Sequence, residues 1–599
     1  MPKEPDTKLE RRVAALEVTV ESLRRRLDSL GQTTDAAPDI SAHPGPAIAI
    51  SADEDVSEEL LSWVGRSSLL PRISTLCFLL VVALALRTVT DHEIVARTTG
   101  SILGMVYASA LIGTGWLQYR RNSALAPVFT VCGGILMAVI VVEIHAHYQA
   151  LPSIPAYLIL LTTGVAMALI SYLYRATLPI ILGTLGMGLA GVAIDYPNPV
   201  YPLLAALLLA ANGLGFGATL INRCSWLRWI LILLTITMMT AWALKLGVKI
   251  PKGDTSGLYP DWYLPSVAAI FLFFTVAATA AIFQRGALRT ARFDLCLPLL
   301  NVLWAFPGAA YVVEASGYGL VGISLIGLLI GCGYFFLMFR IGTLGTAQKG
   351  AGSFALAGVV LCALSLYTLL GNALLPLPVI AATALFLCHQ SDRWHHGSVR
   401  LIATLVQVGV SILFSYTVLT AQPPFSLLQS GLVAAFLAAI NYAHYRASLS
   451  FTPTSTTWFY GSFDQENRTV IILLLSTLAC SFFTLRAITH TLLSSIIGPD
   501  PHVLVCADSA IINTAATALM LFAYFREYKD IRNIAVLVTL IGAIKVFLFD
   551  LFSIAGFPLV ISVLIFGISI FFQSVAFSNR TVIPVLGQKR SDDQAGKLG

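Results

Sequence analysis

Long apolar segments recur along almost the whole chain, and they constrain its fold more than any other feature. Windows of about 20 mostly apolar residues follow one another from about Leu69 to Phe577, separated by short polar connections. Each window is long enough to cross a hydrocarbon core of roughly 30 Å as an α-helix. Membrane barrel strands are excluded, because the windows lack period-2 alternation and are too long. The pattern predicts an all-α fold, a polytopic transmembrane helical bundle of about 18 spans.

Composition excludes a soluble multidomain protein. Of the 599 residues, 57% are hydrophobic and only 11% are charged, and the mean hydropathy is +0.81. Soluble globular domains carry about 25% charged residues. We therefore expect the lipid bilayer to be the main environment of the chain. We expect no nucleic-acid partner, no cofactor and no bound metal.

The distribution of lysine and arginine predicts the orientation in the membrane. The spans centre near residues 79, 107, 135, 163, 184, 210, 236, 273, 304, 328, 360, 381, 409, 435, 478, 516, 541 and 566. If the N-terminus is cytoplasmic and the spans alternate, most of the 37 basic residues fall in inner loops or in the two tails. The few on the outer side are Arg87, Arg97, Lys245, Lys249, Lys252, Arg486 and Lys545. This asymmetry follows the positive-inside rule and predicts that both termini are cytoplasmic.

The N-terminal region differs from the rest of the chain. Residues 1–31 contain a short heptad pattern that ends at Gly31 and predicts a coiled coil. A homodimer would form through its apolar positions, which are Leu9, Val13, Leu16, Val20, Leu23, Leu27 and Leu30. The alternative is a helical tail with no fixed partner, because three heptads are marginal alone. Residues 32–66 are expected to be a disordered acidic tether with a juxtamembrane segment. Residues 67–578 would form the transmembrane domain, and residues 579–599 a cytoplasmic tail.

Several local stretches resemble a family of bacterial multi-pass membrane proteins known as domain of unknown function 2339. They are SWVGR (Ser62–Arg66), RTTGSILGMVYASALIGTGWLQYRR, GGILMAVIVVEIHAHYQALPS, RATLPIILGTLGMGLAG and DIRNIAVLVTLIGAIKVFLFDLFSIAGF. The last of these is similar to a Lys-x-Phe-Leu-x-Asp-Leu signature near the end of the family's sequences. The resemblance covers nearly the whole chain and is most specific at its two ends. It implies a bacterial inner-membrane location and a bundle of many helices, and it implies no reaction.

Charged residues within or beside the spans are the candidate functional residues. A charge at the centre of a membrane helix costs roughly 2.5–3.5 kcal/mol on insertion scales, so such residues are functional candidates by default. Under the predicted topology most of them fall on the outer side, and together they outline an outward-facing polar vestibule. The alternative is that each one reaches singly to the interface. The candidates for binding are Glu143, His145, His147, Asp195, Glu314, Arg486, Lys545 and Asp550.

Three local motifs within this set or near it have competing interpretations. The stretch EIHAH places Glu143 and His147 four residues apart, which suits a zinc or proton-relay site, or simply a solvated helix end. HQSDRWHH resembles a metal cluster only in composition, so a basic-aromatic interface loop is favoured. Glycine pairs such as Gly327 and Gly331 favour close helix packing over nucleotide binding, because no strand precedes them.

The segment AIKVFLFDLFS raises the question of whether Lys545 and Asp550 pair. If the span covers about 532–550, Asp550 lies at its boundary. Five residues in an α-helix amount to about 140° around the axis, so the two side chains are poorly placed for each other. We therefore expect the partner of Lys545 on another span, with Glu314 or Glu143 as candidates.

Three functions remain open. The first is a transporter or flippase-like protein for a small or lipid-linked solute. The second is a membrane-embedded enzyme that modifies envelope glycans or lipids; the absence of a large outer loop and of a paired acidic motif counts against it. The third is an envelope scaffold recruited through the coiled coil.

Overall fold

The structure is a computed structural model, and it describes most of the chain after residue 95. The described residues are 75–76, 78–79, 81–82, 88, 96–123, 125–147, 149–194, 196, 200–222, 225–253, 260–289, 292–343, 350–420, 425–449, 468–498, 500–526, 529–553 and 556–581. The chain divides into two compact units, Met1–Pro71 and Arg72–Gly599. All of the described residues belong to the second unit. The predicted coiled coil and tether lie outside the described residues.

Every element of the second unit with described bounds is helical, as the apolar windows predict. The α-helices are α4 (Arg97–Arg120), α5 (Ala126–Ala146), α6 (Ser153–Tyr174), α7 (Thr177–Ile194), α8 (Tyr201–Asn222), α9 (Ser225–Lys249), α10 (Pro260–Arg289), α11 (Arg292–Ala315), α12 (Val321–Gly342), α13 (Ala351–Leu370), α14 (Pro376–Trp394), α15 (Gly397–Thr420), α16 (Leu427–Leu449), α18 (Arg468–Ile496), α19 (Pro501–Arg526), α20 (Lys529–Ile544), α21 (Leu551–Ser553) and α22 (Phe557–Thr581). A short 3₁₀ turn η1 (Ile250–Lys252) follows α9, and a π-helical segment η2 (Lys545–Asp550) joins α20 to α21.

Among the described residues, 16 helices are long and apolar enough to cross a membrane. They coincide with predicted spans, and the helix α14 coincides with another, although its 19 residues are less apolar because it ends in the sequence QSDRW. The predicted span near residue 79 lies largely outside the described residues. The number of spans therefore stays a prediction, while the all-α class is confirmed for the described part of the chain.

Local sequence explains where individual helices end. Between α13 and α14, Gly371 adopts a positive φ of 60°, which an L side chain rarely adopts, and this ends α13. The side chain of Asn372 then accepts a hydrogen bond from the backbone N–H of Leu374 at 2.8 Å. Pro376 begins α14, where its missing N–H leaves no helical hydrogen bond unmade. The two helices are thus joined by a connection of only five residues.

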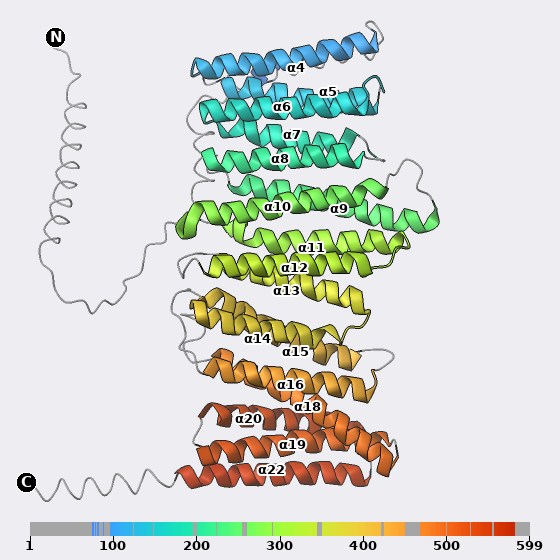
Figure 1. The fold of residues 1–599 in the computed structure, drawn as a ribbon, viewed down its shortest axis with the longest axis vertical. Coiled ribbons are helices and arrows are strands. Elements are labelled where there is room, and N and C mark those ends of the chain that lie inside the picture. The colour runs from blue at the N-terminus through green and yellow to red at the C-terminus, as the bar shows by residue number, and fades with distance from the viewer. Residues whose placement is uncertain are drawn as a thin grey trace, which may run out of the picture. The chain divides into compact units, whose positions relative to one another are not determined.

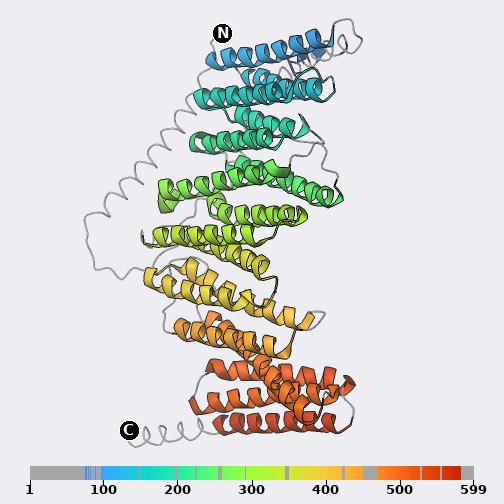
Figure 2. The ribbon, with the colours of Figure 1, turned by 45° about the vertical axis from the view of Figure 1, so that its right-hand side comes forward.

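The helices pack against their near neighbours in the sequence. Figures 1 and 2 show them in an order close to that of the chain, from blue at α4 to red at α22, with α20 drawn between α18 and α19 in Figure 1. Most pack against the next helix along the chain and also against the next but one, as α5 does with α6 and α7, and α14 with α15 and α16. Functional residues far apart in the sequence are therefore brought together only where they lie on such neighbouring helices.

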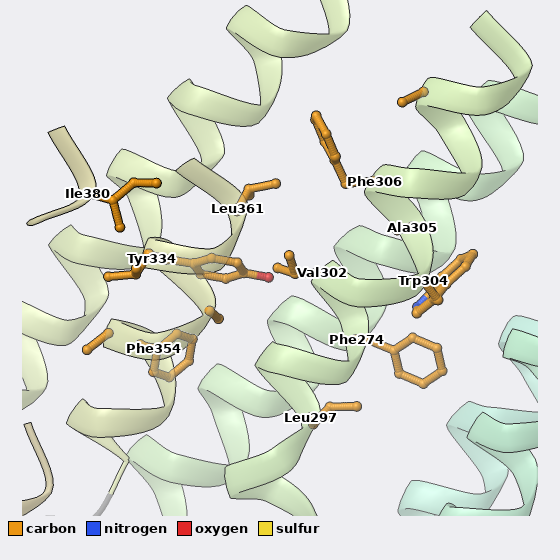
Figure 3. Packing of buried hydrophobic residues seen from close by; sticks show 14 of the residues in the cluster. Phe274, Leu297, Val302, Trp304, Ala305, Phe306, Tyr334, Phe354, Leu361 and Ile380 are labelled. Atoms are coloured by element: carbon orange, nitrogen blue, oxygen red, sulfur yellow. The ribbon is translucent and has the colours of Figure 1, made fainter. Parts of the chain in front are cut away.

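Side chains between the helices form an apolar core. Figure 3 shows part of it, where Phe274 of α10, Phe306 of α11, Tyr334 of α12 and Phe354 of α13 lie between their helices. On the opposite faces of the same helices, large apolar side chains are exposed, among them Leu329 at 74%. A helix that is apolar on its outer face as well as its inner one is suited to lipid. The apolar helices are consistent with an integral membrane protein.

The glycine pair of α12 packs closely against α13, as the sequence predicts. A Cβ atom at Gly331 would lie 2.5 Å from Cys362 Sγ, and one at Gly327 would overlap Ser365 Oγ. Small residues at this spacing let two helix backbones approach each other. The packing interpretation of this glycine run is confirmed.

Candidate functional site

The charges in AIKVFLFDLFS form an ion pair, which corrects the expectation that they do not meet. Lys545 Nζ lies 2.9 Å from Asp550 Oδ1. The expectation was wrong because it assumed α-helical geometry, whereas residues Lys545–Asp550 are a π-helix. In a π-helix the backbone hydrogen bonds join residues i and i+5, so residues five apart lie much closer to one face than they do in an α-helix. Lys545 finds its partner in its own segment rather than in Glu314 or Glu143.

Hydroxyl groups from two other helices complete the surroundings of this pair. Asp550 is 0% exposed, and its Oδ2 accepts hydrogen bonds from Ser509 Oγ of α19 and from Ser562 Oγ of α22, the latter at 2.6 Å. Lys545 Nζ also donates to Ser509 Oγ at 2.5 Å and to the backbone oxygen of Val505 at 3.1 Å. All three ammonium hydrogens and both carboxylate oxygens thus have partners. We call Ser509, Lys545, Asp550 and Ser562 the ion-pair cluster.

The ion-pair cluster lies within the helical segments, close to one end of them. The apolar helical stretch continues to Ser553, so Asp550 is three residues before its end. Ser509 is eight residues into α19 and Ser562 five residues into α22, which places these two serines about 8–12 Å from the starts of their helices. At this depth a charge pair is expensive in lipid unless it is fully coordinated.

A second charged group lies beside the first, between α19 and α18. Asp508 Oδ1 is 2.9 Å from His490 Nε2 and 3.2 Å from Arg486 Nε, both on α18. Arg486 Nε is close enough to Asp508 Oδ1 for an ion pair, but its N–H is not aligned for a hydrogen bond. Consecutive residues of α19, Asp508 and Ser509, therefore serve the two charged groups. Asp508 was missed at the sequence level, although it is the only acidic residue in α19.

Further along α19, α20 and α22 lies a group of uncharged polar side chains. Thr517 Oγ1 donates to Ser569 Oγ at 2.7 Å, Gln573 Nε2 donates to the same oxygen at 3.1 Å, and Thr539 Oγ1 donates to Gln573 Oε1 at 2.8 Å. We call Thr517, Thr539, Ser569 and Gln573 the hydroxyl–amide cluster. Polar side chains therefore follow the α19, α20 and α22 interface over much of its length.

The remaining predicted site residues lie elsewhere. Glu143, His145 and His147 are at the end of α5, where His145 Nδ1 is 2.6 Å from the backbone oxygen of Leu151. Glu314 is exposed near the end of α11. The helix α5 packs on α4, α6 and α7, and α11 packs on α9, α10, α12 and α13, so neither belongs to the group α18–α22. Asp195 lies outside the described residues.

Another buried ion pair was also missed, at the start of two other helices. Arg228 Nη1 of α9 lies 2.6 Å from Asp294 Oδ1 of α11, and these side chains are 2% and 0% exposed. The guanidinium carbon is 4.7 Å from the ring centre of Phe293 and 5.4 Å from that of Phe216. At the sequence level Arg228 was counted only as a basic residue of an inner loop.

Comparison with known proteins adds no family to this description, since no protein-family model, curated protein or solved structure matches the chain. Among the described residues, no group of three or more His, Cys, Asp and Glu side chains is placed to hold a metal ion. The site therefore has to be interpreted from its own chemistry. That chemistry is a lysine and an aspartate within a shell of hydroxyl groups, whose protons are exchangeable.

Proposed function

We propose that this protein is a multi-pass membrane transporter that moves protons, and that Asp550 binds and releases the proton. The observation that carries the proposal is the ion-pair cluster, where Lys545 and Asp550 meet at 2.9 Å on a π-helical segment inside the apolar span. Intramembrane charges and π-helical segments are both enriched at functional sites.

The ion pair has two states of different net charge. With both groups ionised, the pair is neutral and coordinated. A proton that binds Asp550 cancels its charge and leaves Lys545 as a cation without a counter-ion, which is unfavourable in a surrounding of low polarity. Lys545 would then bind an anionic group of a solute, or the segment would rearrange. Either response links proton binding to the movement of a small or lipid-linked solute.

The proposed setting is a bacterial inner membrane with both termini in the cytoplasm. The positive-inside asymmetry supports this orientation, and the resemblance to domain of unknown function 2339 supports the location. In this orientation the ion-pair cluster lies toward the outer side of the membrane. We therefore propose the ion-pair cluster as the site instead of the broader outward-facing vestibule, because Glu143 and Glu314 lie on other helices.

The contacts of the ion-pair cluster support the enzyme and scaffold alternatives less well than the transporter. An envelope-modifying enzyme needs a reactive group that a substrate can reach, whereas Asp550 is 0% exposed and both of its oxygens have partners. The scaffold alternative depends on residues 1–31, which lie outside those that the structure describes.

Proton flux into liposomes tests the proposal directly. The purified full-length chain is reconstituted with a trapped pH-sensitive dye, and a potassium diffusion potential drives proton entry. We expect Asp550→Asn and Lys545→Met each to reduce the flux at least tenfold, since each removes one charge of the pair. Asp261→Asn is the matched control, because Asp261 is an exposed carboxylate in the first turn of α10.

The proposal fails if the wild-type chain carries no more protons than empty liposomes, or if Asp550→Asn carries as many as the wild type. Size-exclusion profiles and thermal unfolding in detergent show whether a variant that loses flux is still folded.

A further inference from the structure

One buried side chain between the two polar clusters has no hydrogen-bond partner. Asn513 of α19 is 0% exposed, and both its Nδ2 and its Oδ1 are without a partner. Burial of an amide without hydrogen-bond partners is unfavourable, because the group loses its bonds to water. Such a group in a native protein calls for an explanation.

The position of Asn513 points to a role in connecting the two clusters. Ser509, Asn513 and Thr517 are spaced by four residues, so they share one face of α19. Ser509 belongs to the ion-pair cluster and Thr517 to the hydroxyl–amide cluster. The backbone oxygen of Asn513 already accepts a hydrogen bond from Ser569 Oγ at 3.1 Å. The amide thus lies between the two clusters, on the face that both use.

The chemistry of the amide identifies its ligand. A bound cation would satisfy only Oδ1, and a bound anion would satisfy only Nδ2. Water is both a donor and an acceptor, so it can satisfy both atoms. The spacing also fits, because four residues of α-helix rise about 6 Å and a single bridging water spans about 5.6 Å between two hydrogen-bonded groups.

A glycine on the neighbouring helix makes room for this side chain. A Cβ atom at Gly542 of α20 would overlap Asn513 Oδ1. The same Cβ would lie 3.4 Å from Ile512 Cγ2, which is an ordinary contact. An alanine at this position would therefore push the amide away from its place between the clusters.

We infer that Asn513 holds a buried water that gives protons access to Asp550 from the hydroxyl–amide side. The inference rests on the proposed function for its role, and on the amide geometry for the water site itself. Nδ2 donates to the water oxygen, Oδ1 accepts one of its hydrogens, and the other hydrogen points toward Ser509. Asn513 gains and loses no proton. The water donates a proton toward Ser509 as it accepts another proton from the hydroxyl–amide side. Asn513 only holds this water in place, so it is a positioning residue.

Two variants of Asn513 and one of Gly542 test the inference in the same liposome assay. We expect Asn513→Leu and Gly542→Ala to reduce proton flux about tenfold, and Asn513→Ser to keep most of it, because a hydroxyl still binds water. Gly567→Ala is the matched control, since a Cβ at that glycine of α22 meets no atom within 4 Å. An experimental structure that resolves ordered water is the second measurement, and we expect density beside the Asn513 amide that is lost in Asn513→Leu.

The outcomes separate this inference from the proposed function. If Asp550→Asn abolishes flux while Asn513→Leu keeps it, the water path is wrong and the transporter stands. If the wild type carries no protons, the transporter is wrong, and density for water at Asn513 decides the water site alone. A structure in which the amide bonds directly to a protein group overturns the water site.

Discussion

Two buried ion pairs in this protein differ in what surrounds them. Both bury an aspartate completely, with Asp294 and Asp550 each 0% exposed. The pair of Arg228 and Asp294 lies among the aromatic rings of Phe216 and Phe293. The pair of Lys545 and Asp550 lies among hydroxyl groups of α19 and α22. Aromatic rings, which have no exchangeable protons, lie beside the first pair, and hydroxyl groups, which have them, lie beside the second.

The two cations, Arg228 and Lys545, also differ in their chemistry. An arginine holds a carboxylate through a rigid planar guanidinium, whereas a lysine is a compact charge on a flexible stem that can turn to another anion. The arginine also gains a cation–π interaction with the rings. The comparison therefore teaches that burial of a charge does not by itself mark a working site. We attribute the arginine pair to the stability of α9 and α11, and the lysine pair to the proposed transport.

The largest expected effect is on the arginine pair. Arg228→Leu removes the cation that lies 2.6 Å from the buried Asp294, and loss of one partner of a buried ion pair costs about 3–5 kcal/mol. We expect a clear fall in the thermal unfolding temperature and in the amount of folded protein recovered from membranes. Unchanged thermal unfolding would show that the pair is solvated, and the comparison with the lysine pair would lose its basis.

Removing both charges of each pair sharpens the comparison. Replacing a whole buried pair with apolar residues of similar size is often neutral for stability. We therefore expect Arg228→Met with Asp294→Leu to recover most of the stability lost in Arg228→Leu and to keep proton flux. Lys545→Met with Asp550→Leu should fold equally well and lose the flux at least tenfold. The two double variants are compared by thermal unfolding and by flux in the same liposomes.

If both double variants kept their flux, or both lost it, the two pairs would have the same role. The assignment of one to stability and the other to transport would then be wrong.

Sequence reasoning located the helices because the signal is local. A window of about 20 apolar residues determines a membrane-length helix on its own, since every backbone group in lipid must bond within the segment. The helix α14 shows the limit of that signal. It ends in QSDRW and its hydropathy falls below that of its neighbours, yet it packs between α13, α15 and α16 like the others.

The candidate site was only partly predictable, because its contacts join distant residues. Lys545, Asp550 and Arg486 were singled out as charges near lipid. Their partners were not, since Ser509 is 41 residues from Asp550 and serines are common in membrane helices. The π-helical geometry that pairs Lys545 with Asp550 also has no signature in the local sequence. A check for acidic residues inside every span would have found Asp508.

The smallest expected effect concerns an uncharged hydrogen bond in the same region as the arginine pair. Tyr263 Oη of α10 donates to the backbone oxygen of Met239 in α9 at 2.9 Å. Tyr263→Phe removes this bond and keeps the ring, and the oxygen of Met239 keeps its place as a helical acceptor. A net loss of about 1 kcal/mol is therefore expected, the usual value for a neutral hydrogen bond. Thermal unfolding measures it, and proton flux should not change. A loss as large as that of Arg228→Leu would mean that α9 and α10 depend on polar contacts in general, and that the buried charge of Asp294 has no special weight there.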